Sequence, residues 1–249
     1  MILVFLYGIL TIMRLDQMLV FRNMYPTRAK AVAAIKAGLV SVNNTVAKKS
    51  SQIVADTDVI NASSLPYSAG RGALKLERAL ECFDVKPNGC VCLDVGASTG
   101  GFTEVLLKNG AAKVYAVDVG TNQLIPELRN DSRVVSLEQT DIRDLVPLSP
   151  VDLIVIDVSF VSLVNIVEFL PQWSAQIVIA LIKPQFEVPR DVAAKFNGVI
   201  KSADWHNWSI NRVTDAFLGA GFDCVGVTES PVKGGSGNTE FLACFKLKK

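Results

Sequence analysis

The sequence is poor in the residues that build disulfide frameworks and metal sites. Its 249 residues include five scattered cysteines and a single histidine, His206. An odd, dispersed set of cysteines in a chain of this length does not predict a disulfide framework. Cys90 and Cys92 alternate along an expected strand, but no histidine or second cysteine pair accompanies them, so we expect no metal site. His206 is expected near a helix start or on the surface, and not as a ligand or a base.

The N-terminus lacks an apolar run long enough to cross a membrane. Residues 1–12, MILVFLYGILTI, are uncharged, but twelve residues are too few to span a bilayer. No basic region precedes the run and no clear cleavage site follows it, so it fits a signal peptide poorly. We therefore expect residues 1–13 to be an apolar extension that function does not need. The protein itself is expected in the cytoplasm and away from membranes.

The chain also lacks a strong net charge, but its charges are unevenly spread. Residues 14–62 hold seven Lys/Arg against three acids, a net charge of +4. The remaining residues, 63–249, hold 18 basic against 21 acidic residues, a net charge of −3. A basic module on a near-neutral body suggests a handle for a polyanion attached to an enzyme. Charge alone leaves a plain solvated basic face as an equal alternative.

The basic module predicts a small α+β domain over residues 14–60. Helices are expected over 14–22 and 27–37, followed by short strands over 39–42 and 45–47. Thr27 is a plausible N-cap and Gly38 a plausible C-cap of the second helix. Asn43-Asn44 is a turn signal between the two strands. A unit of this size has a limited core, so it is expected to lean on the rest of the chain.

A linker is expected over residues 61–72, which are rich in small and turn-forming residues, and a larger α/β domain over 73–249. Strands are expected at 91–95, 114–117, 134–137, 152–158, 177–182, 225–228 and 241–245, with helices at 73–80, 102–109, 121–129, 162–170 and 203–220. Near-continuous Val/Ile/Leu strands between helices predict a Rossmann-like, mostly parallel seven-stranded sheet covered on both faces. The last two strands are expected to form an antiparallel pair at one edge.

The clearest chemical signal is a glycine-rich loop between the first strand of this domain and the following helix. Ligands of such folds bind outside the carboxyl ends of the strands, and glycines let the backbone approach them closely. The loop lacks the G-x-G-x-x-G spacing and starts with Asp94, whose carboxylate disfavours a pyrophosphate but tolerates a sulfonium donor. We therefore expect S-adenosylmethionine (SAM) and not a dinucleotide.

Two further acids extend this expected cofactor site. Asp118 ends the second strand, where an acid can accept the ribose hydroxyls of the cofactor. Asp141 follows the third strand, where SAM enzymes place a side chain near the adenine amine. The expected cofactor-binding residues are Asp94, Gly96, Ala97, Ser98, Thr99, Gly100, Gly101, Phe102, Asp118, Asp141 and Asp157. A plain strand–turn–helix packing loop is the weaker alternative.

A second group of polar residues follows other strands of the expected sheet. Asp157, Lys183 and Glu240 each lie at or near a strand end, so they could converge on one crevice, and Lys75 adds a fourth charge. For each lysine alone, a surface salt bridge is the commoner fate. The conjunction of all four favours catalysis, because they match the Lys-Asp-Lys-Glu set of FtsJ-like ribose 2′-O-methyltransferases.

The basic module resembles the S4 domain that occurs in several RNA-modifying enzymes. The resemblance rests on Arg14-Leu15-Asp16, on Arg28-x-x-Ala31, and on Gly38-x-Val40-x-Val42-Asn43. It implies that basic side chains meet RNA phosphates while the hairpin shapes the edge of the groove. The expected RNA-binding residues are Arg14, Arg22, Arg28, Lys30, Lys36, Lys48 and Arg71. A generic helical cap on the enzyme is the alternative.

The motifs together resemble the TlyA (haemolysin A) family of ribosomal RNA methyltransferases. They are GRGALKL, LDVGASTGGFT, VYAVDVG, IDVSF, LIKPQFE and GNTEF, behind an S4-like module, and the resemblance covers residues 14–249. Each short string alone would be weak. The resemblance implies a SAM-dependent enzyme that methylates a ribose 2′-hydroxyl and takes ribosomal RNA or a ribosomal subunit as partner, with Lys75, Asp157, Lys183 and Glu240 as its catalytic residues.

The chemistry needs such a set, because a ribose hydroxyl is a poor nucleophile at neutral pH. Methyl transfer is an in-line displacement, so alignment and partial deprotonation supply the rate. Lys183 is expected to activate the hydroxyl, which requires a lowered ammonium pKa, and Lys75 could be the neighbouring cation that lowers it. Asp157 and Glu240 would orient the lysines and the ribose, and would oppose that lowering.

Two other functions remain open at this point. An RNA-binding factor of ribosome assembly could keep the fold without turnover, although the complete set of four charged residues argues against it. A membrane-lytic role, which the older family name implies, has little support in the charged composition after residue 12. The sequence does not reveal the methylated nucleotide or the oligomeric state.

Overall fold

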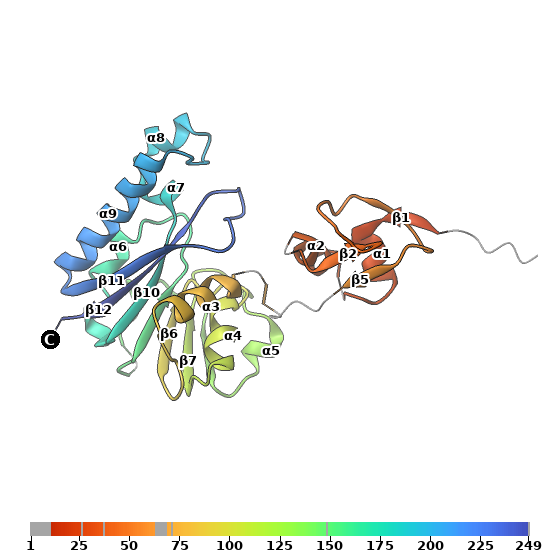
Figure 1. The fold of residues 1–249 in the computed structure, drawn as a ribbon. Coiled ribbons are helices and arrows are strands. Elements are labelled where there is room, and N and C mark those ends of the chain that lie inside the picture. The colour runs from red at the N-terminus through yellow and green to blue at the C-terminus, as the bar shows by residue number, and fades with distance from the viewer. Residues whose placement is uncertain are drawn as a thin grey trace, which may run out of the picture. The chain divides into compact units, whose positions relative to one another are not determined.

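The computed structural model describes residues 11–25, 27–36, 38–62, 69–70, 72–147 and 149–248. The predicted extension over residues 1–13 and the predicted RNA contact of Arg71 therefore lie largely or wholly outside the described residues. The chain divides into two compact units, Met1–Gly70 and Arg71–Lys249 (Figure 1). Each unit is described by itself.

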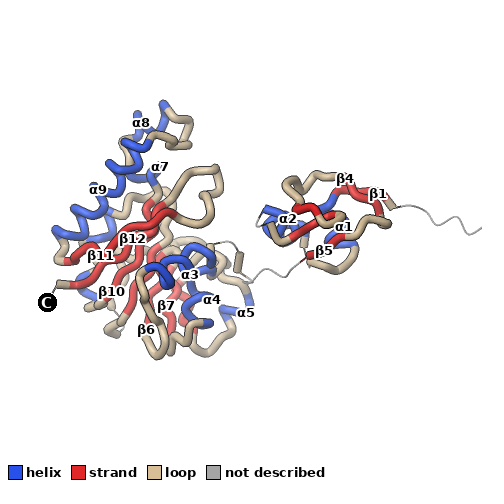
Figure 2. The backbone as a smooth tube through the Cα atoms, viewed as in Figure 1, coloured by secondary structure: helices blue, strands red, loops and turns tan. Residues whose placement is uncertain are grey.

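The first unit combines two short helices with two small sheets (Figure 2). Its elements are β1 (Ile12–Arg14), α1 (Leu15–Phe21), α2 (Arg28–Lys36), β2 (Val40–Val42), β3 (Thr45–Val46), β4 (Ile53–Ala55) and β5 (Ile60–Ala62). The predicted helices and the β2–β3 hairpin are confirmed. Thr27 Oγ1 accepts the Lys30 N–H at 3.3 Å, as an N-cap does.

Three strands of the first unit were not predicted. β5 adds to the hairpin to give the order β3-β2-β5, and β1 pairs antiparallel with β4. Each has only three residues, which is too short for an alternating pattern to stand out. Buried apolar side chains of α1 and α2, among them Leu15, Met18 and Ile35, form the core between the helices and strands.

The second unit is built around one seven-stranded sheet. Its elements are α3 (Ala73–Cys82), β6 (Val91–Val95), α4 (Gly101–Lys108), β7 (Lys113–Val117), α5 (Pro126–Arg129), β8 (Val134–Leu137), β9 (Leu153–Ile156), α6 (Val164–Val167), η1 (Pro171–Trp173), β10 (Ile177–Ile182), α7 (Pro184–Glu187), α8 (Arg190–Lys195), α9 (Ala203–Gly219), β11 (Phe222–Glu229) and β12 (Phe241–Leu247). The strand order is β11-β12-β10-β9-β6-β7-β8. This confirms the predicted mostly parallel sheet.

Helices cover both faces of this sheet, with α3 and α4 on one side and α6 and α9 on the other (Figure 1). The strands of the middle are buried along nearly their whole length, which explains their continuous apolar runs. β12 runs antiparallel to β10 and β11, so the expected edge pair is also confirmed. From β6 the chain continues to β7 on one side, and from β9 it continues to β10 on the other side, so the strand order reverses between β6 and β9. The carboxyl ends of β6 and β9 thus flank the point where such sheets bind ligands.

The prediction of a helix over 121–129 is wrong for the first half of that range. Only Pro126–Arg129 is helical, and Asn122 adopts a positive φ of 52° within the preceding loop. The helix predicted over 162–170 is reduced to α6. Helices α7 and α8 were not predicted, because each is a turn or two long and begins next to a proline.

Candidate active site

A cavity of about 490 Å³ opens at the carboxyl ends of β6, β7 and β9. Its wall is largely apolar, with side chains that include Val117, Ile142 and Ile166. Three acids also line it, Asp118, Asp141 and Asp157, against one basic residue, Arg143. An apolar wall with an excess of carboxylates suits a flat ring and a cationic centre better than a phosphate.

The glycine-rich loop meets this cavity only in part. Gly96 and Ser98 line it. Gly96 has a φ of +83°, and a Cβ there would lie 2.6 Å from the carbonyl oxygen of Asp157, so the loop backbone rests on the β9 loop. A Cβ on Gly101 would lie 3.0 Å from the Ala73 nitrogen, which brings the N-termini of α3 and α4 together.

The other loop residues of the predicted cofactor set do not line the cavity. They are Ala97, Thr99, Gly100, Gly101 and Phe102. Gly100 has a φ of +99° and lies against the side chains of Leu124 and Leu128. The glycines at 100 and 101 thus pack against protein, and a cofactor contact for this part of the loop stays a prediction.

Asp94 is fully buried behind the loop. Thr103 Oγ1 donates to its Oδ2 at 2.6 Å, whereas its Oδ1 has no hydrogen-bond partner among the described residues. Burial raises the pKa of Asp94 to about 7, against the hydrogen bond from Thr103, and the charges of Asp157 and Asp118 raise it further. A buried oxygen without a partner is a place for a proton or for a donor group of a ligand.

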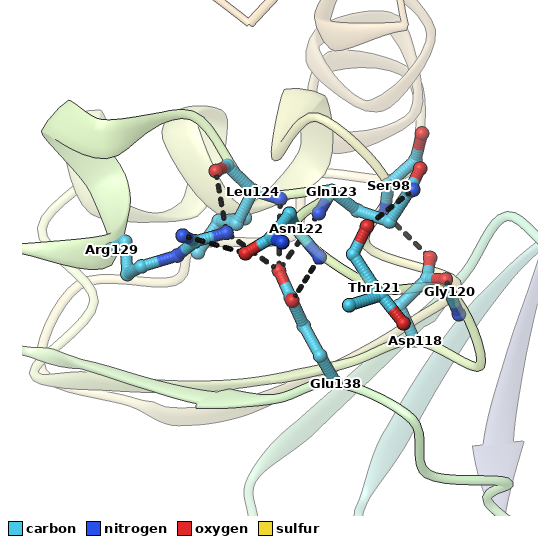
Figure 3. Close-up of polar contacts among 9 residues, drawn as sticks. All are labelled: Ser98, Asp118, Gly120, Thr121, Asn122, Gln123, Leu124, Arg129 and Glu138. Carbon is cyan, nitrogen blue, oxygen red and sulfur yellow. Dashed lines mark hydrogen bonds and ion pairs between the residues drawn. The ribbon is translucent and has the colours of Figure 1, made fainter.

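Asp118 organises two loops at once. Its Oδ2 accepts the Ser98 N–H at 2.8 Å and its Oδ1 accepts the Gly120 N–H at 2.7 Å (Figure 3). The carboxylate thus joins the glycine-rich loop to the loop after β7 while it lines the cavity. Each carboxylate oxygen has a second acceptor site, so the predicted contact with ribose hydroxyls is compatible with these bonds.

Asp141 is held by its neighbour Arg143. Arg143 donates from Nε and Nη2 at 2.9 and 2.6 Å, and these hydrogen bonds lower the pKa of Asp141. Both residues line the cavity. The pairing keeps the Asp141 carboxylate ionised and fixes its orientation, so it can accept a hydrogen bond from a ligand amine.

The four residues of the predicted catalytic set lie in one ion-pair network. Lys75 Nζ lies 2.6 Å from Glu240 Oε2 and 4.0 Å from Asp157 Oδ2. Lys183 Nζ lies 2.6 Å from Asp157 Oδ1. Lys75, Lys183 and Glu240 are buried, and Asp157 also faces the cavity. The network brings together α3, the ends of β9 and β10, and the start of β12.

The sheet explains why these residues meet. Asp157 and Lys183 follow the parallel strands β9 and β10, and Glu240 precedes β12, which runs in the opposite direction. Ile182 pairs with Phe241 in the ladder, so Lys183 and Glu240 emerge at the same edge. A catalytic role for these residues stays a prediction that this geometry supports.

Two residues of the β9 loop, Ser159 and Phe160, stand in the IDVSF motif, but the sequence assigned no role to either. Ser159 Oγ accepts a hydrogen bond from Lys183 Nζ at 2.8 Å. Phe160 is 91% exposed with a φ of +66°, although it lines the cavity, and its ring lies 5.2 Å from that of Phe186. A bulky residue in the left-handed region is a strained conformation that tends to mark function. Sequence periodicity carries no signal for it.

The first unit places its basic residues in different ways. Asp16 is buried and accepts hydrogen bonds from Arg14 and Arg28, and the bond from Arg14 in particular lowers the pKa of Asp16 to about 2. Arg22 donates to the backbone carbonyls of residues 55, 56 and 58, which favours a structural role. Lys36 and Lys48 are exposed, and Lys30 is half-buried. Their contacts with RNA stay predictions.

The described residues contain neither a candidate membrane span nor a candidate metal site. Within them, no helix is long and apolar enough to cross a membrane. Nor do the residues with assigned positions include a cluster of three His, Cys, Asp or Glu side chains that could hold a metal ion.

Known proteins resemble the chain over most of its length. The FtsJ-like methyltransferase family matches residues 69–247, and the S4 domain matches residues 13–60. Hemolysin A of Brachyspira hyodysenteriae is 40% identical, with 94% of this chain and 99% of that protein covered. The Mycobacterium tuberculosis protein named 16S/23S rRNA (cytidine-2′-O)-methyltransferase TlyA is 41% identical, with 94% and 90% covered.

A solved structure agrees with these relatives. A protein from Streptococcus thermophilus that is named as a hemolysin has a TM-score of 0.73 at 38% identity, covering 95% of this chain and 88% of that one. The predicted order of domains, an S4 module ahead of a Rossmann-like methyltransferase domain, is confirmed. The chain belongs to the FtsJ-like methyltransferase family, among its S4-containing relatives of the TlyA (hemolysin A) type.

Proposed function

We propose that this protein transfers a methyl group from SAM to a ribose 2′-hydroxyl of ribosomal RNA in the cytoplasm. The observation that carries the proposal is the buried network of Lys75, Asp157, Lys183 and Glu240 beside the cavity. The relatives named as ribosomal RNA (cytidine-2′-O)-methyltransferases support the choice of acceptor. The S4 domain docks the enzyme on structured RNA.

The residues of the cavity suit SAM. When bound, SAM supplies an electrophilic methyl group on a cationic sulfur. Asp118 and Asp141 offer acceptors for ribose hydroxyls and for an amine, and the apolar wall suits an adenine ring. Asp157, at the border of the cavity and the network, places negative charge beside a cationic centre and orients Lys183.

The chain's own residues then prepare the acceptor. Asp157 and Ser159 hold Lys183 Nζ from two sides, so this nitrogen is placed to accept the proton of the attacking hydroxyl once the ammonium group has lost its own proton. When bound, SAM would supply the methyl group to that ribose oxygen, and Asp118, Asp141 and Asp157 would hold it. Glu240 holds Lys75 on the other side of Asp157. Alignment of the oxygen with the methyl carbon is the main contribution of such a site.

Phe160 completes the proposed acceptor site. Its exposed ring lines the cavity, and Phe160 lies in the same loop as Asp157 and Ser159. Base–aromatic stacking is worth roughly 1–3 kcal/mol and tolerates any base, because every base has a π face. The ring thus offers a platform for the base whose ribose lies at Lys183.

Two measurements test the proposal. Ribose methylation blocks alkaline cleavage, so ribosomal RNA from cells with and without the protein should differ at a resistant position. In vitro, Lys183→Ala should abolish methyl transfer to ribosomal RNA or subunits and leave SAM binding intact. Lys195→Ala is the matched control, because Lys195 is an exposed lysine on α8. Full activity of Lys183→Ala would remove Lys183 from its role.

The same assay separates a rival function. A factor of ribosome assembly without turnover would bind RNA yet incorporate no labelled methyl group. A membrane-lytic protein would release dye from liposomes. RNA binding without methyl transfer by the unaltered protein would overturn the proposal.

A further inference from the structure

The loop between β7 and α5 is held by a carboxylate that does not reach the cavity. Glu138 follows β8, and its Oε2 accepts the Asn122 N–H at 2.5 Å (Figure 3). Its Oε1 accepts the N–H groups of Gln123 and Leu124 at 2.9 and 3.1 Å. Arg129 Nη2 lies 3.0 Å from the same oxygen. Glu138 is absent from the cavity wall.

This carboxylate serves three successive N–H groups that have no helix or strand to bond to. Residues 119–125 contain neither, and Asn122 has a positive φ. The backbone bonds to Glu138 lower its pKa, so the carboxylate stays charged at neutral pH. A surface ion pair with Arg129 alone would hold the loop weakly. Three N–H bonds to one charged acceptor fix its path.

The loop that Glu138 holds contacts the cofactor site at two places. Gln123 lines the cavity, together with Asp118 at the start of the loop. A Cβ on Gly120 would lie 2.7 Å from the Gln123 side chain and 3.0 Å from Asp118 Oδ1, so Gly120, Gln123 and Asp118 pack tightly together. The position of Asp118 therefore depends on the path of the loop.

The second contact is with the glycine-rich loop. A Cβ on Gly100 would lie 2.8 Å from Leu124 Cδ1, and the Ile125 N–H bonds to the Thr99 carbonyl at 3.3 Å. Asp118 bonds to Ser98 in the same loop. Glu138 thus links the loops that follow β6, β7 and β8, because the 120–124 segment that it binds belongs to the loop after β7 and contacts the other two.

We infer that Glu138 is a positioning residue for the cofactor: it holds the 120–124 loop in the path that sets Asp118, Gln123 and the glycine-rich loop around the cavity. The inference rests on the proposed function only in that SAM is the ligand of the cavity. It predicts that loss of Glu138 weakens SAM binding and leaves the methyl-transfer step unchanged once the site is filled.

The test measures SAM binding to the full chain by calorimetry, without RNA. Glu138→Ala should raise the Kd by a factor of about ten to a hundred, the usual weight of hydrogen bonds to a charged group. Glu138→Gln keeps one acceptor oxygen and should fall between this variant and the parent. In a transfer assay, the KM for SAM should rise while kcat and the KM for RNA stay at the parent values.

Asp131→Ala is the matched control. Asp131 lies just before β8, is of similar exposure, pairs with Arg133 and accepts a backbone N–H, but it is not part of the cavity or its loops. Its removal should leave the Kd for SAM unchanged. A parent-like Kd in Glu138→Ala, or an equal loss in Asp131→Ala, would overturn the inference. If Glu138→Ala does not fold, a parent-like Kd in Glu138→Gln overturns it.

The result is independent of the acceptor. If the parent binds SAM and the Glu138 variants do not, the inference stands even where ribosomal RNA gains no methyl group. If ribosomal RNA is methylated and the variants bind SAM as the parent does, the inference fails and the proposed function stands.

Discussion

Gly234 lies directly against the carboxylate of Glu240, so that a methyl group at position 234 would overlap Glu240 Oε1. The turn that places it there is closed by the Gly234 N–H, which bonds to the Asn238 carbonyl at 2.9 Å. Asn238 is itself buried, and its amide bonds to the backbone of residues 198 and 200. The loop before β12 thus packs against Glu240, the residue that pairs with Lys75, and limits where its carboxylate can lie.

The first prediction concerns the contact between Gly234 and Glu240. Gly234→Ala should push Glu240 away from Lys75 and lower kcat by about a hundredfold, since a displacement of about 1 Å in such a site can cost that much. Gly235→Ala is the control, because a Cβ at Gly235 meets nothing within 4 Å. Steady-state methyl transfer measures both. Full activity of Gly234→Ala would show that Glu240 need not be held in place.

The second prediction concerns Phe160. Phe160→Ala should lower kcat/KM for RNA by about tenfold to a hundredfold, from the loss of roughly 1–3 kcal/mol of base stacking. Phe160→Tyr keeps a ring and should retain most of the activity. Val146→Ala removes another exposed apolar side chain, outside the cavity wall, and should have no effect. A parent-like Phe160→Ala would exclude the stacking platform.

Phe160→Gly adds an independent measurement. Glycine tolerates the positive φ of 66°, so this variant should be more stable than the parent by about 1 kcal/mol while it loses activity. Denaturant unfolding measures the difference. A gain in stability with a loss of activity is expected only where the strained conformation serves function.

The order of strands and helices follows from the sequence because burial on both faces imposes long apolar runs. Val91–Val95 and Ile177–Ile182 show this plainly. The loop at 119–125 could not be predicted, since its path is set by Glu138, fourteen or more residues away in sequence. Local periodicity favoured a helix there. The Glu138 carboxylate instead accepts hydrogen bonds from N–H groups that would bond to backbone carbonyls in a helix.

The polar residues of the site were easier to anticipate than their supports. Lys75, Asp157, Lys183 and Glu240 stand in short motifs beside strand ends, and parallel strands bring such ends together. Gly234 and Glu138 carry no such signal. Their roles arise from close packing and from backbone contacts, which a single sequence does not reveal.

The third prediction concerns Glu187, a buried carboxylate that ties two loops of the site. It accepts hydrogen bonds from Ser162 Oγ at 2.5 Å and from the Leu163 N–H at 2.8 Å. The ion pair between Lys183 and Asp157 joins the same two segments: Lys183 lies four residues before Glu187, and Asp157 lies five residues before Ser162. Glu187→Ala should therefore lower kcat by about tenfold or more through a displaced Lys183, with the Kd for SAM changed little.

Glu187→Gln is the test of positioning. Its amide can bond to both Ser162 and Leu163, so it should restore most of the lost rate. Glu168→Ala, at an exposed glutamate next to α6, is the control and should behave as the parent. If Glu187→Gln is as slow as Glu187→Ala, the carboxylate acts by its charge and not as a tie between the loops.

The last prediction concerns pH and Asp94. Burial raises the pKa of Asp94 to about 7, above its value near 4 in an unfolded chain. Between these values the folded state binds more protons than the unfolded state, so Asp94 makes the unfolding free energy fall as pH rises from about 4 to 7. The fall amounts to roughly 4 kcal/mol at most.

Asp94→Asn should remove this fall, because the amide is neutral at every pH. The variant and the parent should be of similar stability below about pH 4, and the variant should be increasingly the more stable as the pH rises to 8. Tryptophan fluorescence during urea unfolding reports the second unit alone, since Trp173, Trp205 and Trp208 all lie in it. Asp215→Asn, at an exposed aspartate of α9, is the control and should follow the parent. Parallel profiles for the parent and Asp94→Asn would show that Asp94 is ionised in the folded protein without its cofactor.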